Sequence, residues 1–246
     1  MYIYDIYISI FMITLPFDNN WKKIAISMSG GADSALLAYL ICKKIKTQEF
    51  HVINHIRCWK TKPWQKYDAI NVYNWLQKKF PDVIMQKHVN FIPPEMEWGD
   101  VGPVWVDEYG KNVSGDNIEL RAFAEYICQT NDIDVYFNAV TRNPRNVDFQ
   151  GMPTRNIDQT EDNQHLLLMR HMNRLAAHPF RFTEKSEIVK EYINQGIQDL
   201  FDLTRSCEGT FEHITYETYI PGQKVPTCGK CFWCKERKWA VEQAFK

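Results

Sequence analysis

The chain has almost no net charge and no basic residue near its start. Its 29 Lys and Arg residues nearly match its 30 Asp and Glu residues, leaving a formal charge of −1 at pH 7. This balance gives the protein as a whole no electrostatic reason to bind nucleic acid, so no nucleic-acid partner is required. No Lys or Arg precedes Lys22, so the apolar stretch Met1–Pro16 lacks the basic region of a secretory signal, and it is too short for an ordinary membrane span. We therefore expect no membrane segment, and we interpret Met1–Pro16 as either an extra edge strand or sequence upstream of a natural start at Met12.

The composition does not fit a small disulfide-stabilised protein. Seven cysteines occur in 246 residues, a length unusual for that class, and four of them cluster in a pattern that a metal explains better. We therefore expect a reducing, cytoplasmic setting. Hydrophobic residues make up 45% of the chain, which is ample for a core. The length predicts one large domain or one domain with a small appendage. We expect the large domain at residues 1–200 and a C-terminal segment with the four clustered cysteines at residues 201–246.

The sequence also lacks a Walker phosphate-binding loop, because no Gly-Lys-Ser or Gly-Lys-Thr follows its glycine-rich turn. It has instead the hexapeptide Ser29–Ser34, which reads S-G-G-A-D-S and lies between an apolar run and a helical pattern. Two adjacent glycines allow close approach of a ligand to the backbone, and the N-terminus of the next helix attracts anions. The hydroxyls of Ser29 and Ser34 add hydrogen-bond donors, and Asp33 is placed to cap the helix or to organise a metal-bound phosphate. The alternative is a glycine-rich turn that binds nothing.

Apolar periodicity predicts strands and helices in alternation, which favours an α/β fold: a Rossmann-like parallel sheet with helices on both faces. We expect helices at 35–46, 66–80, 114–128, 164–175 and 183–195, and strands at 50–56, 83–89 and 134–140 in addition to the strand before the hexapeptide. Residues 90–113 form a long loop rich in aromatic and acidic residues, interpreted as a lid, a subunit contact or a plain surface insert.

Polar residues follow the strand at 134–140, where ligands bind in open α/β sheets, so we expect Asn138 to face the site. The next loop contains Arg142, Arg145 and Arg155, which either grip a phosphate or carboxylate or remain solvated. His51 and His55 invite a metal hypothesis, but histidines on a strand are more often packing residues.

Four cysteines near the C-terminus have the spacing of a metal site. Twenty residues separate Cys207 from Cys228, and pairs of residues separate Cys228, Cys231 and Cys234. Four thiolates at this spacing can surround one tetrahedral Zn²⁺ and stabilise a segment with little core of its own. An iron–sulfur cluster, which also takes four thiolates, is the alternative. Cys42 and Cys128 lie in apolar helical patterns and are expected to be packing residues.

The hexapeptide resembles the pyrophosphate loop of the N-type ATP pyrophosphatases, in which ATP is cleaved to AMP and pyrophosphate while a substrate carbonyl is adenylated. Together with the cysteine motif, it resembles the 7-cyano-7-deazaguanine synthase family over most of residues 22–246. Lys185–Val189 and Thr204–Cys207 also resemble that family. This resemblance implies ATP, Mg²⁺ and Zn²⁺ as cofactors, a 7-deazapurine-like carboxylate and ammonia as substrates, and a homodimer.

The resemblance also implies the site residues. The zinc ligands would be Cys207, Cys228, Cys231 and Cys234, and the catalytic residues Asp33, Ser34 and Lys185. With the strand-end argument, the nucleotide contacts would be Ser27, Ser29, Gly30, Gly31, Asp33, Ser34 and Asn138. The chain departs from the family at Asp116, where Arg is usual, and at Thr141–Pro144, where an aspartate and a Tyr-Pro-Asp turn are usual. These departures lie beside the expected acceptor site.

Two other functions remain open at this point. One is a tRNA-thiolating enzyme of the same superfamily that carries an iron–sulfur cluster. The other is a non-catalytic module that binds a nucleotide and zinc without releasing pyrophosphate.

Overall fold

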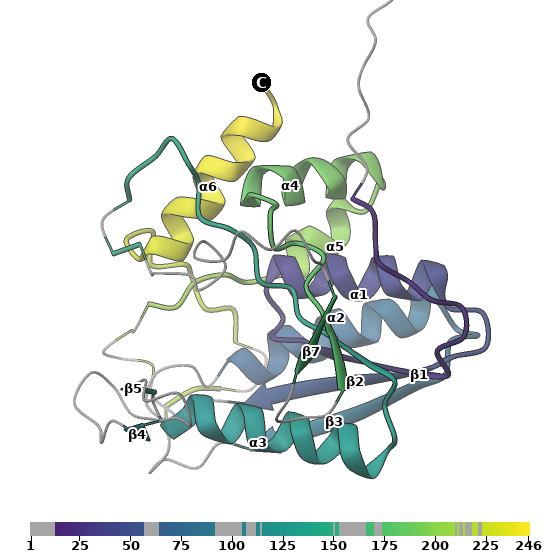
Figure 1. Ribbon diagram of the computed structural model, residues 1–246. Helices are drawn as coiled ribbons and strands as arrows, with labels where there is room; N and C mark the ends of the chain where they lie inside the picture. Colours follow the sequence, from purple (N-terminus) through teal and green to yellow (C-terminus); the bar gives the residue numbers. More distant parts are fainter. Residues whose placement is uncertain are drawn as a thin grey trace, which may run out of the picture.

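The fold is built on a six-stranded sheet with the order β3-β2-β1-β6-β8-β7. Figure 1 shows its strands between helices that lie above and below them. The computed structural model describes residues 13–56, 64–91, 105–106, 112–113, 115–149, 151–152, 166–169, 174–209, 211, 214, 218–220 and 223–246. The strands are β1 (Lys23–Ser27), β2 (Glu49–Ile56), β3 (Met85–Phe91), β6 (Val135–Phe137), β7 (Leu166–Met169) and β8 (Arg174–Ala177). All neighbouring strands are parallel except β7, which is antiparallel to β8. A separate two-stranded ribbon joins β4 (Trp105–Val106) to β5 (Asn112–Val113).

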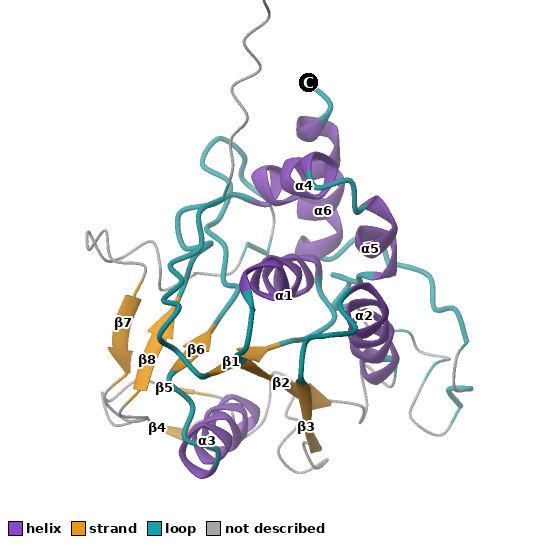
Figure 2. Ribbon diagram, turned by 90° about the vertical axis from the view of Figure 1, so that its right-hand side faces the viewer, coloured by secondary structure: helices purple, strands orange, loops and turns teal. Residues whose placement is uncertain are grey.

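Helices cover both faces of this sheet (Figure 2). They are α1 (Ala32–Lys44), α2 (Gln65–Lys79), α3 (Gly115–Thr130), α4 (Lys185–Asn194), α5 (Gln198–Leu203) and α6 (Phe232–Ala244). Helices α1 and α2 lie on one face and α3 on the other, while α4, α5 and α6 form a further layer beyond α1 and α2 (Figure 2). The predicted Rossmann-like fold is therefore confirmed. No helix in the described part of the chain is long and apolar enough to cross a membrane.

Strand β1 is apolar on both faces because both faces are covered. Ile24 and Ile26 belong to the main core, together with α1, whereas Ala25 belongs to the smaller core under α3. All three residues are fully buried. A continuous apolar run is typical of a central parallel strand with helices on both sides.

The chain changes direction along the sheet at β1. From β1 it passes through α1 to β2 on one side, whereas β6, which comes much later, pairs with the other side of β1. At such a switch point the two following loops diverge and leave a crevice at the carboxyl ends of the strands. The hexapeptide Ser29–Ser34 and the loop after β6 both begin there.

The predicted helix at 164–175 is wrong. The structure has an antiparallel pair of strands there, with Leu166 opposite Ala177 and Met169 opposite Arg174. Leucine and methionine favour helices when judged by propensity alone, but pairing with the edge of an existing sheet overrides that weak preference.

Several sequence predictions fall on residues outside the described part of the chain. These include residues 1–12 of the proposed extra strand, most of the 90–113 loop, and Arg155. Ile13–Pro16 is described and forms no strand.

His51 and His88 form a partly buried polar contact between β2 and β3. The His51 Nδ1 atom lies 2.9 Å from His88 Nε2, the two rings are stacked, and Glu49 lies 3.4 Å from His51 Nε2. His55 is also buried and packs edge-on against Phe123. The interpretation of these strand histidines as packing residues fits the structure.

This histidine pair should make stability depend on pH. Burial and then the neighbouring His88 hold the pKa of His51 below its usual range, and burial also lowers the pKa of His88. In acid, the unfolded chain therefore binds more protons than the folded chain. The free energy of unfolding should consequently fall as pH drops below about 6.5. The slope contributed by each histidine is at most about 1.4 kcal/mol per pH unit.

Urea denaturation between pH 7.5 and pH 5 measures this effect. A His51→Gln/His88→Gln variant should show a flatter pH dependence than the wild type. Gln86→Ala, a change at an exposed neighbour on β3, should leave the slope unchanged. An unaltered slope in the double histidine variant would contradict the assignment.

Candidate functional site

Two serine hydroxyls hold the loop between β1 and α1 in shape. Ser34 Oγ accepts a hydrogen bond from the Ser29 N–H (3.2 Å) and donates one to the Gly31 carbonyl (3.1 Å). Ser29 Oγ accepts from the Gly31 N–H (3.2 Å) and lies 3.3 Å from Ser34 Oγ. Gly31 is the N-cap residue of α1 and has no side chain that could cap the helix. The first N–H groups of any α-helix have no intrahelical acceptor, and in α1 no side chain of the N-cap residue accepts from them either. They are therefore suited to bind an anion.

Gly30 is required at its position for two reasons. Its φ of +81° lies in the left-handed region, and a Cβ atom there would lie 2.7 Å from the Ala69 backbone nitrogen. Its carbonyl also accepts a hydrogen bond from the Arg205 N–H (3.0 Å). The loop is thus packed directly against the first turn of α2 and against the C-terminal part of the chain.

Gly30→Ala should therefore destabilise the protein more than an ordinary glycine substitution. The positive φ and the backbone clash together should cost about 2–5 kcal/mol of unfolding free energy. Gly196→Ala is a matched control, because Gly196 also has a positive φ (+65°) but nothing lies within 4 Å of its added Cβ. Urea denaturation of both variants separates the clash from the backbone strain, and equal losses would contradict the proposed close approach.

Asp33 and Lys185 form a partly buried ion pair beside the loop. Lys185 Nζ lies 2.5 Å from Asp33 Oδ2, and Lys185 is only 3% exposed. One interpretation of the sequence is that Asp33 caps α1. The structure shows no such cap, because the Asp33 carboxylate faces α4 instead. Asp33 Oδ1 is buried and has no hydrogen-bond partner among the described residues. This oxygen is a suitable ligand for a cation.

Lys185 lies at a buried position where a positive charge is unfavourable unless negative charge lies beside it. Lys185 is the first residue of α4, where the helix dipole repels positive charge. The helix is held there by a capping box of Glu184 and Glu187, and by the Tyr192 hydroxyl, which donates to the Ala32 carbonyl (2.7 Å). A buried lysine held at such a place, with one carboxylate beside it, suits a ligand that brings further negative charge.

These groups line one cavity of about 320 Å³ at the carboxyl ends of β1 and β6. Its lining residues are Ser27, Ser29, Gly31, Ala32, Asp33, Ser34, Asn138, Ala139, Val140, Thr141, Lys185, Arg205, Ser206, Glu208 and Trp233. The fold therefore brings together every expected nucleotide-contacting or catalytic residue except Gly30, which shapes the loop without lining the cavity.

Sequence reasoning missed one wall of this cavity. Arg205, Ser206 and Glu208 flank the ligand candidate Cys207, and Trp233 lies between Cys231 and Cys234. Their position next to the cysteines was the available signal. In contrast, Arg142 and Arg145 do not line the cavity, so the structure does not support the interpretation that they bind a phosphate or carboxylate there. Their backbone N–H groups bond to Thr183 and Glu184.

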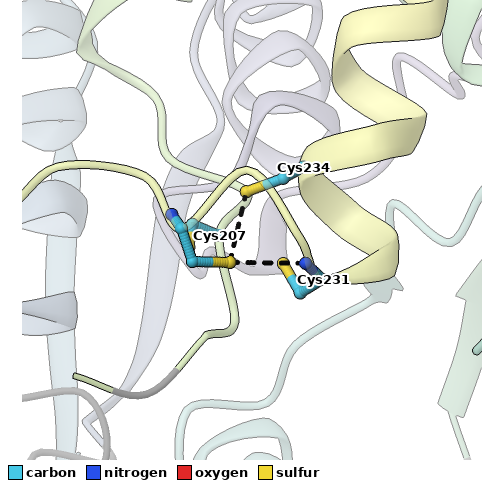
Figure 3. Close-up of side chains that lie close together, drawn as sticks. Cys207, Cys231 and Cys234 are labelled. Carbon is cyan, nitrogen blue, oxygen red and sulfur yellow. Dashed lines mark hydrogen bonds between the residues drawn. The ribbon is translucent and has the colours of Figure 1, made fainter. Parts of the chain in front are cut away.

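The four clustered cysteines do converge. The sulfur atoms of Cys207, Cys228, Cys231 and Cys234 all lie within 4.8 Å of one another, the only such group among the described residues. Figure 3 shows Cys207 pointing toward Cys231 and Cys234 at the start of α6. Cys228 Sγ lies 3.9 Å from Cys234 Sγ, close to the edge of about 3.8 Å that a tetrahedron of 2.3 Å zinc–sulfur bonds requires.

The backbone around the cysteines is also suited to thiolates. The Cys228 N–H donates to Cys207 Sγ and the Cys231 N–H donates to Cys228 Sγ, both at 3.3 Å. A Cβ at Gly209 would lie 2.6 Å from Cys228 Sγ, so a glycine is needed beside the cluster. The donor set and its spacing fit one metal ion.

A second, smaller cavity of about 120 Å³ lies beside the loop. Its walls are mainly apolar and include Met28, Val52, Ala69, Ile70, Tyr73 and Val89, with the polar residues Asn54, Lys66 and Lys87. The Asn54 side chain donates to the Met28 carbonyl (2.6 Å) and so fixes the backbone that leads into the hexapeptide.

Comparisons with known proteins give only distant similarity. No protein-family model matches the chain, and no curated protein matches it. The U34-tRNA thiolase NcsA from Methanococcus maripaludis, solved with its [4Fe-4S] cluster, is 11% identical with a TM-score of 0.43. The match covers 90% of this chain and 63% of the thiolase, which is less than two thirds of its length.

Two synthetase structures are similar to the chain to a comparable degree. The NMN synthetase from Francisella tularensis is 12% identical with a TM-score of 0.43, and the match covers 92% of this chain and 87% of the synthetase. The NAD+ synthetase from Burkholderia pseudomallei is 11% identical with a TM-score of 0.39, covering 92% and 78%. Similarity this distant says nothing about the reaction.

Proposed function

We propose that the protein is an ATP-dependent ligase that adenylates a carboxylate and then amidates it with ammonia, releasing AMP and pyrophosphate. The observation that carries this proposal is the convergence of three anion-binding features in one cavity: the hydroxyl-lined loop, the uncapped first turn of α1, and Lys185 paired with Asp33. Together they suit the β- and γ-phosphates of a nucleotide.

In this proposal the N–H groups at the start of α1 and the hydroxyls of Ser29 and Ser34 bind the pyrophosphate part of ATP. Lys185 neutralises charge that develops on the leaving pyrophosphate. Asp33 orients Lys185 and offers Oδ1 to Mg²⁺, which when bound would offset further phosphate charge. The smaller cavity beside Met28 suits the adenine ring, because its walls are apolar and it adjoins the loop.

The substrate carboxylate would enter from the other wall of the large cavity. A carboxylate oxygen attacks the α-phosphorus, the bond to pyrophosphate breaks, and an acyl-adenylate forms. Ammonia then adds to the acyl carbon, AMP leaves, and an amide results. A second adenylation, on the amide oxygen, would allow loss of AMP and protons to give a nitrile.

We further propose that the acceptor is 7-carboxy-7-deazaguanine or a related acid, and that a Zn²⁺ bound by Cys207, Cys228, Cys231 and Cys234 stabilises the wall that contacts it. The sulfur spacing supports a single ion, since in a four-iron cluster each thiolate binds a different iron and the sulfurs lie farther apart. Four thiolate ligands leave no open position on the ion, so its role is structural.

A pyrophosphate-release screen tests this function. Zinc-loaded protein is incubated with ATP, Mg²⁺ and ammonium together with 7-carboxy-7-deazaguanine, other purine-like acids or tRNA, and the products are identified by mass spectrometry. We expect AMP, pyrophosphate and an amide or nitrile from one of the acids. Lys190→Ala, an exposed change on α4, serves as the active control.

The other outcomes separate the alternatives. Release with tRNA and a sulfur donor, from protein that absorbs visible light, would favour a thiolating enzyme with an iron–sulfur cluster. ATP binding without pyrophosphate release under any condition would favour a non-catalytic module. Absence of ATP binding would contradict the proposal outright.

A further inference from the structure

Arg205 connects three parts of the molecule that are far apart in sequence. Its backbone N–H donates to the Gly30 carbonyl (3.0 Å), which belongs to the phosphate-binding loop. Its guanidinium donates to the carbonyls of Val225 (2.5 Å) and Pro226 (2.8 Å), just before Cys228. The same guanidinium lies over the ring of Trp64, 5.0 Å from its centre, at the start of α2.

Arg205 therefore contacts two parts of the chain, the cysteine segment and the Ser29–Ser34 loop, which are suited to different ligands. On one side, Arg205 is two residues from Cys207 and holds the backbone that leads to Cys228, so its position depends on the cysteine cluster. On the other side, it is bonded to Gly30, whose neighbours Ser29 and Gly31 line the nucleotide cavity. Arg205 thus bonds directly both to the loop and to the segment before Cys228.

The environment of α2 is coupled to the same group. Asp68 lies in the first turn of α2, where the backbone closely approaches Gly30. Burial raises the pKa of Asp68 to about 6, and the positive charge of Arg205 acts in the opposite direction. Movement of Arg205 would therefore change the electrostatics of α2 as well as the hydrogen bond to the loop.

We propose that Arg205 is a positioning residue that couples metal occupancy of the four-cysteine site to nucleotide binding by the Ser29–Ser34 loop. This inference rests on the proposed function, because its second ligand is the nucleotide. A metal ion on the cysteines fixes Val225 and Pro226, these fix the guanidinium, and the Arg205 backbone then holds Gly30 in its left-handed conformation. Binding free energies are reciprocal, so the nucleotide must strengthen metal binding by the same factor.

Lysine cannot replace arginine in this role. A guanidinium is planar, donates in two fixed directions to two carbonyls and stacks on an indole, whereas an ammonium group is a compact point charge. Arg205→Lys keeps the charge and the backbone N–H but loses the paired bonds, so it should uncouple the two sites. Arg174→Lys is the matched control. Arg174 is paired with Asp132 and is the first residue of β8, at the end of the strand away from the cavity.

The first measurement is the rate at which zinc-loaded protein loses zinc to an excess of a colorimetric chelator, with and without the ATP analogue AMP-PNP. In wild type and Arg174→Lys we expect AMP-PNP to slow zinc loss about fivefold or more. Arg205 also lines the cavity, so AMP-PNP is used at a concentration that saturates each variant. In Arg205→Lys, which should still bind one zinc per chain, saturating AMP-PNP should change the rate less than about twofold. Equal slowing in Arg205→Lys, or no slowing in wild type that binds AMP-PNP, would overturn the coupling.

A second measurement needs no nucleotide. Hydrogen–deuterium exchange of residues 27–34 is compared in zinc-loaded and zinc-stripped protein. We expect zinc removal to increase exchange of this segment in wild type, and Arg205→Lys to show the same high exchange in both states. If wild type binds no AMP-PNP but shows this exchange difference, the proposed function fails, whereas the link that Arg205 makes between the cysteine site and the Ser29–Ser34 loop stands. An exchange rate independent of zinc in wild type overturns the coupling.

Discussion

Replacing Lys185 with alanine should reduce the rate of pyrophosphate release by about 10²–10³-fold, the usual effect of removing one group that stabilises charge in a transition state. Lys185 is the more buried of the two cationic residues that line the cavity, and its described ion-pair partner is Asp33. The variant should also lose about 2–4 kcal/mol of unfolding free energy, because Asp33 would be left partly buried without its partner. Steady-state release assays and urea denaturation measure the two effects separately.

A double variant distinguishes chemistry from folding. Asp33→Asn combined with Lys185→Met removes both charges, so no uncompensated charge remains in the interior. We expect it to recover most of the lost stability and none of the lost activity. Lys190→Ala, on the exposed side of the same helix, should resemble wild type in both assays. Recovery of activity in the double variant would mean that Lys185 supports only the fold.

Replacing Cys231 with serine should reduce bound zinc from one ion per chain to almost none, because a serine hydroxyl is a poor substitute for a thiolate. Binding of a structural zinc contributes directly to folding, and losing even about 4 kcal/mol would lower the Tm of a chain this long by about 8–16 °C. Elemental analysis and calorimetry provide the measurements. Cys128→Ser, at a buried cysteine of α3 far from the cluster, should lose some stability but keep its zinc.

Gly209→Ala tests the geometry of the same cluster without removing a ligand. The added Cβ would lie 2.6 Å from Cys228 Sγ, so the sulfur must shift and zinc affinity should fall. The Gly196→Ala variant should keep wild-type zinc affinity, because its added Cβ meets nothing within 4 Å. Wild-type affinity in Gly209→Ala would show that the cluster tolerates displacement of Cys228.

Removal of a metal bound by the cysteines should also weaken contacts outside the cluster, because two of these cysteines begin the C-terminal helix α6. On α6, Arg237 donates to the Thr204 hydroxyl (2.8 Å) and to the Phe201 carbonyl (2.9 Å), and its guanidinium lies 3.8 Å from the centre of the Phe201 ring. Cys231 and Cys234 begin that helix. Release of the cysteines would therefore loosen the contact between α6 and α5, and with it the segment that carries Arg205.

Sequence alone determined the features that depend on neighbouring residues. The apolar run followed by Ser29–Ser34 predicted a strand, a ligand-binding turn and a helix, and β1 and α1 confirm the strand and the helix. Alternation of strands and helices predicted the parallel sheet with helices on both faces, and the spacing of four cysteines predicted a cluster whose sulfurs do converge. These signals are local because backbone conformation and short ligand spacings are set within a few residues.

Only the tertiary structure decided which distant residues meet. Lys185 lies 152 positions from Asp33, and no periodicity relates them. Arg205 reaches Gly30 because β1 ends beside the C-terminal segment, and residues 166–169 form a strand because the edge of β8 is available for pairing. Such contacts depend on the order of strands in the sheet, which local propensity does not encode. The candidate site therefore forms only when the fold brings the Ser29–Ser34 loop, α4 and the cysteine segment together at the carboxyl ends of the strands.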